Sequence, residues 1–292
     1  MKTVPLGNTG EQVSQLCLGA MYLGTRQNEA ESFALLDQYV DAGGSFIDTA
    51  NIYAHWIPGF AGGESETVLG RWMAARGNRD HQLFIASKVG FGYPGVEGGL
   101  NAQQIESECD KSLKRLGVDT IDLYYAHVDD RNTPLQETLE AFARLVQAGK
   151  VRYIGASNYL AYRLERAHTL AKLNDWPQFC CLQQRYTYLQ PRFGKRDVAA
   201  QEPVTEEMLD YVRARQGDLT LLAYSVLLAG AYTRSDRAVS ETYDSPDNNA
   251  RMLALRAIAQ QTGATANQIV LAWMMQSDPP VIPLIAASTA DQ

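Results

Sequence analysis

The sequence predicts an α/β fold in which eight parallel strands close into a (β/α)8 TIM barrel. Short apolar, β-branched or aromatic runs recur along the chain, and amphipathic stretches of helical period separate them, which is typical of repeated βαβ units. No Pro/Ser-rich linker or break in composition interrupts the 292 residues, so we expect a single domain over residues 1–292. The predicted strands are residues 15–20, 45–48, 83–87, 120–126, 151–156, 180–184, 219–224 and 281–285.

Other architectures remain open. The length also permits two small domains, and a doubly wound open sheet is the structural alternative to the barrel. An open sheet that binds dinucleotides normally carries GxGxxG after its first strand, whereas residues 18–24 are LGAMYLG, which has the wrong spacing. Almost nothing follows the predicted strand 281–285, so we expect the last helix of the barrel to be absent or truncated.

Capping signals delimit several of the helices expected between these strands. Asn101 can cap a helix with an apolar face, and Gly117 lies just past its end. Residues 133–136, TPLQ, predict an N-cap threonine, a proline at the first helical position and a capping-box glutamine, and Gly149 ends that helix. Residues 229–249 are polar, acidic and uncapped, which predicts a mobile loop.

The charge balance argues against a nucleic-acid partner, since 26 basic and 33 acidic residues give a net charge of −7 without a basic block. The N-terminal MKTVP lacks the features of a secretory signal. The longest apolar stretch, residues 219–232, is too short for a bilayer, which takes about 20 residues. We therefore expect a soluble, cytoplasmic protein without a membrane partner; the sequence leaves its oligomeric state open.

The cysteines and histidines indicate neither a disulfide framework nor a metal site. The sequence contains no CxxC pair, and the adjacent cysteines would point to opposite faces of a strand, so buried free thiols are the simplest interpretation. No pair of histidines or cysteines has metal-ligand spacing, and we expect no metal. His81 and His168 are interpreted as surface residues. The cysteines are Cys17, Cys109, Cys180 and Cys181.

Reactive side chains follow the predicted strands at the point where each strand ends. In a parallel barrel these ends meet at one mouth, where active sites are built. About one strand–helix unit separates successive positions, so we expect the side chains to converge although they are distant in sequence. They are Asp48, Lys88, His127, Ser157, Asn158, Gln183, Tyr224 and Ser225.

These residue types suit the acid-assisted reduction of a carbonyl group. A hydride that reaches a carbonyl carbon leaves an alkoxide, which needs a proton and a positive environment. Tyr53 is a weak acid, with an ordinary pKa of about 10, but the ammonium of Lys88 would stabilise its phenolate and Asp48 would keep that lysine charged. His127 can hold the carbonyl oxygen through a hydrogen bond. No serine lies in a GxSxG motif, so acyl transfer does not compete.

Several strings along nearly the whole chain are similar to those of one enzyme family. They include FIDTANIY at residues 46–53, GESETVLG at 63–70, IDLYYAH at 121–127 and GKVRYIGASN at 149–158. On these motifs the chain resembles the aldo-keto reductases. The resemblance implies a (β/α)8 barrel and an oxidoreductase that reduces small aldehydes or ketones, or oxidises the alcohols in reverse. Aromatic residues beside polar ones suit a sugar-like compound, although aromatic pockets accept many aldehydes; they are Tyr22, Trp56, Phe60 and Tyr125 beside His55 and Asp129. The implied cofactor is NADP(H), or NAD(H) as in some members.

The resemblance also assigns roles to individual residues. The catalytic residues would be Asp48, Tyr53, Lys88 and His127, with Tyr53 as the general acid. Tyr53 and His127 would also contact the substrate, and we expect Tyr22, His55 and Trp56 to contact it because of their residue types and their positions near the site. The nicotinamide carboxamide would lie on the Ser157-Asn158 pair and on Gln183, the nicotinamide ring on Tyr224, and the pyrophosphate on residues 225–230. In full, the residues expected to contact the cofactor are Gly19, Met21, Asp48, Ser157, Asn158, Gln183, Tyr224, Ser225, Leu227, Gly230, Ser288 and Gln292.

Two features depart from the family pattern. Members that prefer NADP(H) usually carry a basic residue after the last strand, but no basic residue follows Arg256 here. Either Arg234 or Arg237 serves the 2′-phosphate instead, or a missing tail carries that subsite, or the enzyme accepts NAD(H). Residues 55–63 form a longer loop than in many relatives, and we expect this loop to overhang the site and shape the substrate pocket.

Two other function classes are compatible with the sequence. Some relatives that resemble channel β-subunits bind the nucleotide as regulatory redox sensors, and an intact catalytic tetrad disfavours this alternative. A non-redox barrel that uses phosphate sites is the third class. Cofactor that binds but is not oxidised with any carbonyl compound of a broad panel would favour the regulatory subunit, whereas the non-redox barrel would show no change in protein fluorescence with NADPH.

Overall fold

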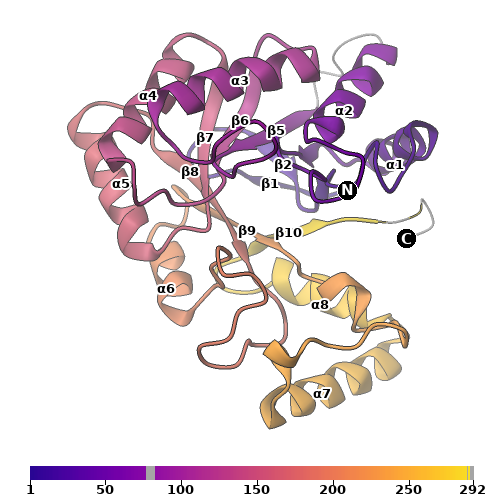
Figure 1. Ribbon diagram of the computed structural model, residues 1–292. Helices are drawn as coiled ribbons and strands as arrows, with labels where there is room; N and C mark the ends of the chain where they lie inside the picture. Colours follow the sequence, from indigo (N-terminus) through magenta and orange to yellow (C-terminus); the bar gives the residue numbers. More distant parts are fainter. Residues whose placement is uncertain (77–82, 288, 290–292) are drawn as a thin grey trace.

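Eight parallel strands form a closed barrel at the centre of the molecule (Figure 1). The computed structural model describes residues 1–76, 83–287 and 289. Neighbouring strands follow the order β10-β3-β4-β5-β6-β7-β8-β9, and β9 pairs in turn with β10, which closes the barrel, so the predicted (β/α)8 barrel is confirmed. The strands are β3 (Cys17–Gly19), β4 (Phe46–Asp48), β5 (Phe84–Val89), β6 (Ile121–Ala126), β7 (Val151–Ser157), β8 (Phe179–Arg185), β9 (Thr220–Tyr224) and β10 (Val281–Ile285).

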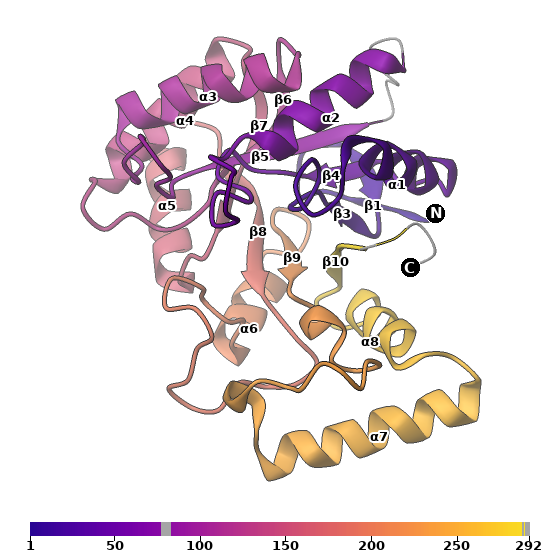
Figure 2. The same cartoon turned by 45° about the vertical axis from the view of Figure 1, so that its right-hand side comes forward.

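Helices surround the barrel, and Figure 2 shows α7 as the element farthest from the strands. Both α7 and α8 precede β10, and within the described residues no helix follows that strand. Among the residues that the structure describes, no helix is long and apolar enough to cross a bilayer. The helices are α1 (Glu29–Asp41), α2 (Glu64–Ala75), α3 (Ala102–Leu116), α4 (Leu135–Gln147), α5 (Ala161–Leu173), α6 (Glu206–Ala214), α7 (Pro246–Thr262) and α8 (Ala266–Met275), with 3-10 turns η1 (Leu228–Gly230) and η2 (Glu241–Tyr243).

The sequence signals at the two ends of α3 act as predicted. The side chain of Asn101 accepts a hydrogen bond from the backbone N–H of Gln104 at 2.9 Å. Gly117 lies in the left-handed region at φ +66°, and its N–H donates to the carbonyl of Leu113. The buried face of the helix contains apolar residues and also Glu108, whose carboxylate therefore needs partners inside the protein.

The predicted cap of α4 is wrong. The helix begins at Leu135, with Pro134 as the N-cap residue and without a side-chain cap. The hydroxyl of Thr133 donates to Oδ2 of Asp130 at 2.6 Å instead, because an ionised carboxylate is a strong acceptor. Gly149 follows the end of the helix at φ +72°, as predicted.

The segment 229–249, predicted to be a loop without elements, contains the end of η1, all of η2 and the start of α7. The side chain of Ser245 accepts from the backbone N–H of Asn248 at 3.2 Å, and Pro246 occupies the first turn of α7. Serine followed by proline is itself a signal for a helix start, so this helix start can be recognised in the sequence. The interpretation of the segment as uncapped is therefore wrong.

The amino end of the barrel interior is filled by an apolar cluster. A hairpin of β1 (Thr3–Pro5) and β2 (Gln12–Ser14) covers this end and contributes Leu6 and Val13, which are fully buried. The hairpin region is tied to strand starts, since the N–H of Gly7 donates to Oγ1 of Thr220 at 2.7 Å. Because this end is closed, the polar strand ends at the opposite mouth are left to form a site.

Both cysteines of the adjacent pair belong to the interior cluster, so the prediction that they point to opposite faces is wrong. The register between β7 and β8 shifts beside Gly155, which lies opposite both Cys180 and Cys181. A bulge of this kind interrupts the alternation of side chains along a strand. The prediction of buried free thiols holds for all of the cysteines.

His168 is buried, so its interpretation as a surface residue is wrong. Its Nδ1 lies 3.0 Å from Oη of Tyr211 on α6, and its Nε2 lies 3.2 Å from the carbonyl of Phe179 on β8. The ring therefore joins α5 to two neighbouring elements. His81 lies outside the described residues.

Gly155 leaves no room for a side chain. A Cβ there would lie 2.7 Å from the ring of Tyr125 and 2.9 Å from Sγ of Cys181. We expect Gly155→Ala to lower the free energy of unfolding by about 1–3 kcal/mol, because the overpacked interior must shift. Urea unfolding followed by circular dichroism measures this loss. The same substitution should cost less in a Cys181→Ala background, and an unchanged unfolding midpoint in the wild-type background would contradict the packing argument.

Candidate active site

A buried ion pair joins the ends of two neighbouring strands. Asp48 is the last residue of β4 and Lys88 lies near the end of β5, and neither side chain is exposed. The ammonium of Lys88 donates to Oδ1 of Asp48 and, at 2.7 Å, to the carbonyl of Thr49. Burial lowers the pKa of Lys88, and the adjacent charge of Asp48 opposes that shift. The pairing of β4 with β5 thus brings together two residues predicted from distant segments.

Tyr53 lies in the turn after β4 and completes this cluster. The ammonium of Lys88 donates to its hydroxyl at 2.6 Å, and the hydroxyl donates to Oδ1 of Asp48 at 3.3 Å. Burial raises the pKa of Tyr53 well above its ordinary value, and the charge of Asp48 raises it further. This direction is opposite to the one expected from Lys88 alone. Tyr53 is therefore protonated in this arrangement and holds a proton that it can donate.

His127 directly follows β6 and lies beside Tyr53. The two rings meet edge to face, with their centroids 6.0 Å apart. The ring of Phe91 also meets the imidazole edge to face, with a centroid distance of 4.8 Å. Burial lowers the pKa of His127 well below its ordinary value, and the charge of Lys88 lowers it further. The imidazole is therefore neutral, with one nitrogen able to donate and the other to accept.

A second polar group lies on the far side of the mouth from β4. Asn158 donates to the carbonyl of His127 at 2.9 Å and to Oγ of Ser157 at 3.0 Å, and its Oδ1 accepts from Oη of Tyr224 at 2.7 Å. The amide of Gln183 donates to Oδ2 of Asp48 at 2.8 Å. Of the residues predicted for carboxamide binding and ring stacking, Gln183 is thus bonded directly to Asp48, whereas Ser157, Asn158 and Tyr224 form a chain of hydrogen bonds that ends on the carbonyl of His127.

The segment 225–230, predicted to contact the pyrophosphate, forms a tight turn after β9. Ser225, Leu228 and Ala229 have positive φ angles of 58°, 47° and 55°, and Gly230 follows at 90°. The N–H of Leu228 donates to the carbonyl of Ser225 at 3.0 Å, which closes the turn. The backbone changes from right-handed at Leu227, with φ −99°, to left-handed at Leu228, and such a change can turn successive N–H groups towards an anion.

The remaining residues predicted for the cofactor lie near the first and last barrel strands. Gly19 ends β3 and pairs in register with Asp48, and a Cβ there would lie 2.7 Å from the side chain of Leu284. Met21 follows this strand and is half-buried. Ser288 and Gln292 lie outside the described residues.

The loop 55–63 carries two of the residues predicted for the substrate. His55 and Trp56 meet edge to face with centroids 5.2 Å apart, and 47% of Trp56 is exposed. Tyr22, in the loop after β3, stacks with Arg26, whose guanidinium lies 4.2 Å from the ring centroid. Their contacts with a substrate stay predictions.

Arg234, predicted as one of two substitutes for a 2′-phosphate ligand, is already paired. Its guanidinium makes two hydrogen bonds to the carboxylate of Asp236, at 2.9 and 2.6 Å. A phosphate at Arg234 would have to compete with this carboxylate.

Sequence reasoning missed two side chains that contact the predicted site. Phe91, which packs on His127, comes shortly after Lys88 in the loop that follows β5. Arg185 ends β8, and its guanidinium lies 3.4 Å from Oγ of Ser225 and donates to Oε1 of Gln201 at 2.7 Å. The signal was available for Arg185, since it lies two residues after Gln183 at a strand end.

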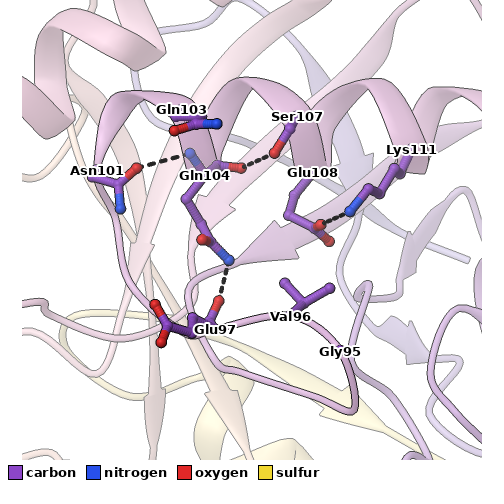
Figure 3. Close-up of a pocket in the computed structure, with 9 residues that line it drawn as sticks. All are labelled: Gly95, Val96, Glu97, Asn101, Gln103, Gln104, Ser107, Glu108 and Lys111. Carbon is purple, nitrogen blue, oxygen red and sulfur yellow. Dashed lines mark hydrogen bonds and ion pairs between the residues drawn. The ribbon is translucent and has the colours of Figure 1, made fainter.

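A shallow cavity of about 370 Å³ lies beside α3 rather than at the mouth of the barrel (Figure 3). Its walls are the segment from Gly95 to Glu97 and the exposed side of α3, and none of the predicted site residues lines it. Glu108 and Lys111 form the ion pair at one end of the cavity. Across the described ranges, no three His, Cys, Asp or Glu residues are grouped as a metal site requires.

The sequence matches the model of the aldo/keto reductase family over residues 15–292. The chain belongs to the aldo/keto reductase family. It is 32% identical to the uncharacterized oxidoreductase YrpG of Bacillus subtilis, a match that covers 100% of this chain and 89% of that protein. It is 31% identical to a norsolorinic acid reductase of Emericella nidulans, over 97% of this chain and 73% of that protein.

A further relative is an aryl-alcohol dehydrogenase of Pestalotiopsis microspora, 29% identical over 94% of this chain and 71% of that protein. These relatives carry names of oxidoreductases, and the chain shares their family over most of its length. This protein is therefore an oxidoreductase of the aldo/keto reductase type, and the fold and family expected from the sequence are confirmed.

Proposed function

We propose that this protein transfers a hydride between a nicotinamide cofactor, NADP(H) or NAD(H), and the carbonyl carbon of an aldehyde or ketone, with Tyr53 as the general acid. The same site would oxidise the alcohol in reverse. The observation that carries the proposal is the contact of the Tyr53 hydroxyl with both Lys88 and Asp48 at one mouth of the barrel. Membership of the aldo/keto reductase family supports it.

The residues around this cluster fit a nicotinamide ring and its carboxamide. A carboxamide needs donors and acceptors, and the buried side chains of Ser157, Asn158 and Gln183 offer both. The ring of Tyr224 offers a face for stacking, and the turn 225–230 offers backbone N–H groups for the pyrophosphate. When bound, the reduced cofactor supplies the hydride.

Tyr53 supplies the proton. As negative charge develops on the substrate oxygen, the proton moves from Oη to that oxygen, and Lys88, which already donates to Oη, stabilises the remaining phenolate. Asp48 keeps Lys88 charged against the cost of burial. The raised pKa of Tyr53 holds the proton in place until the substrate oxygen becomes basic. His127, neutral and beside Tyr53, would donate a hydrogen bond to the carbonyl oxygen and orient it.

Aromatic carbonyl compounds are the substrates that we propose to test first. The rings of Phe91 and Trp56, one beside His127 and one in the loop 55–63, suit an aromatic partner. The name of the aryl-alcohol dehydrogenase among the relatives supports the same class. A steady-state assay should compare NADPH with NADH against aromatic aldehydes, sugars and quinones. Cofactor that binds but is not oxidised with any carbonyl would favour a regulatory role instead.

Tyr53→Phe removes the proposed proton and leaves the ring. We expect kcat for carbonyl reduction to fall by about 10²- to 10⁴-fold, the usual contribution of a general acid. The dissociation constant for NADPH, measured by protein fluorescence, should stay within a few-fold of the wild type. Tyr162→Phe is the matched control, because 56% of Tyr162 is exposed. Undiminished turnover in Tyr53→Phe would exclude the tyrosine as the acid.

The pKa directions lead to an expected pH profile. Reduction needs a protonated Tyr53, and because the pKa of Tyr53 is raised, it stays protonated to a higher pH than a free tyrosine. Reduction also needs a neutral His127, and because the pKa of His127 is lowered, it stays neutral to a lower pH than a free histidine. We therefore expect kcat/KM for the carbonyl substrate at saturating NADPH to be flat between about pH 6 and pH 8. At higher pH it should decline where Lys88, whose pKa burial lowers, loses its proton. Initial rates in a series of buffers at constant ionic strength measure this. A rate that declines as the pH falls, with a midpoint near 6.5, the ordinary pKa of histidine, would contradict the neutral role of His127.

A further inference from the structure

Glu108 is a carboxylate buried inside the protein, with 1% of its side chain exposed. Its Oε2 accepts hydrogen bonds from Nδ2 of Asn51 at 2.7 Å and from Oη of Tyr93 at 2.8 Å. Its Oε1 accepts from Nζ of Lys111 at 2.7 Å, one turn along the same helix (Figure 3). Burial raises the pKa of Glu108, but these bonds outweigh it, and the net direction is down. The carboxylate is therefore ionised and fully partnered.

The two partners of Oε2 come from the loops that carry the candidate site. Asn51 lies in the turn after β4, between Asp48 and Tyr53, and its backbone N–H donates to the carbonyl of Lys88 at 3.4 Å. Tyr93 lies in the loop after β5, two residues after the Phe91 that packs on His127. One oxygen atom on α3 thus holds both the turn of the proposed acid and the loop behind the imidazole.

The loop 55–63 also reaches this point. A Cβ at Gly62 would lie 3.1 Å from the carbonyl oxygen of Asn51 and 3.3 Å from Cδ2 of Tyr93, so the end of the loop packs directly on both residues. The orientation of the Asn51 amide depends on Glu108, because Oδ1 of Asn51 is buried without a partner among the described residues. Glu66, which is also a buried carboxylate, shows the contrast, since it binds Ser87 on β5 and Arg115 on α3 instead of the loops of the site.

We propose that Glu108 is a positioning residue for the reductase reaction, acting through Asn51 and Tyr93 on the turn of Tyr53 and the loop of Phe91. The proposal rests on the proposed function. A hydrogen bond to an ionised acceptor is roughly twice as strong as one between neutral groups, and burial protects these bonds from competition with water. Displacement of a reacting group by about 1 Å can cost on the order of 100-fold in rate, so the anchor matters for turnover more than for cofactor binding.

The test exchanges the amide and the carboxylate of the bond between Asn51 and Glu108, first at Asn51 alone and then at both residues. Asn51→Asp sets a second carboxylate against Glu108, and we expect kcat at pH 8 to fall by about 10- to 100-fold while the dissociation constant for NADPH changes less than about two-fold. Part of the loss should return at pH 5.5, because the two carboxylates can then share a proton. Asn51→Asp with Glu108→Gln should recover kcat to within about five-fold of the wild type, since the glutamine amide can donate to the new aspartate.

Glu106→Gln is the matched control on α3, because Glu106 is 42% exposed and pairs with Arg144 at the surface. Its kcat should equal that of the wild type. If Asn51→Asp fails to fold by circular dichroism, Tyr93→Phe removes one bond to Glu108 without a new charge, and kcat should fall by about 3- to 10-fold.

The outcomes separate the two proposals. A wild-type protein that oxidises no NADPH with any carbonyl would overturn the proposed function, and this inference with it. An active wild type with normal kcat in a folded Asn51→Asp or Tyr93→Phe protein would overturn the positioning role alone. An impaired Asn51→Asp protein that neither Glu108→Gln nor acid pH rescues would overturn it as well, because the loss would then not come from the contact with Glu108.

Discussion

The ion pair between Lys88 and Asp48 is the interaction on which the arrangement of the candidate site depends. Both side chains are fully buried, and moving two charges out of water costs several kcal/mol each. Direct contact offsets this cost, and so do the further hydrogen bonds with Thr49, Tyr53 and Gln183. Apolar side chains in this position would stabilise a barrel as well or better. The pair is therefore better explained by what it does to Tyr53 than by stability.

The barrel makes this pair possible because it fixes the register of neighbouring strands and fills the space below them. The cluster beneath the pair contains Cys17, Cys181 and Tyr125, and the ring of Tyr125 lies 5.8 Å from the ammonium of Lys88. Gly155 accommodates that ring, and Sγ of Cys181, beside the bulge in β8, donates to the hydroxyl of Tyr125 at 3.4 Å. The packing of the interior is thus continuous with the support of the lysine.

The barrel and the residues at its mouth could be predicted because their signals are local. Buried parallel strands are apolar runs, and strand ends lie where those runs stop. The features that were missed depend on distant partners. His168 is enclosed by Tyr211 on α6 and Phe179 on β8, and Glu108 on α3 is bound by side chains from two other loops. No pattern within α3 indicates that Asn51 and Tyr93 meet that carboxylate. Thr133 is an exception, because the carboxylate that replaces its capping bond belongs to Asp130, three residues before it.

Asp48 and Glu108 are buried carboxylates that both contact the turn after β4. One acts on the proton of Tyr53 and the other holds the backbone of the turn, and a single group cannot do both. Asp48 accepts from the hydroxyl of Tyr53 and from Lys88, so its charge bears directly on the proton. A rigid anchor at that atom would compete with the transfer itself. Glu108 binds Asn51, two residues before Tyr53, and holds the backbone without contact to the proton. Rigid support from outside the reacting groups is what an acid needs if its hydroxyl has to change partners during the reaction.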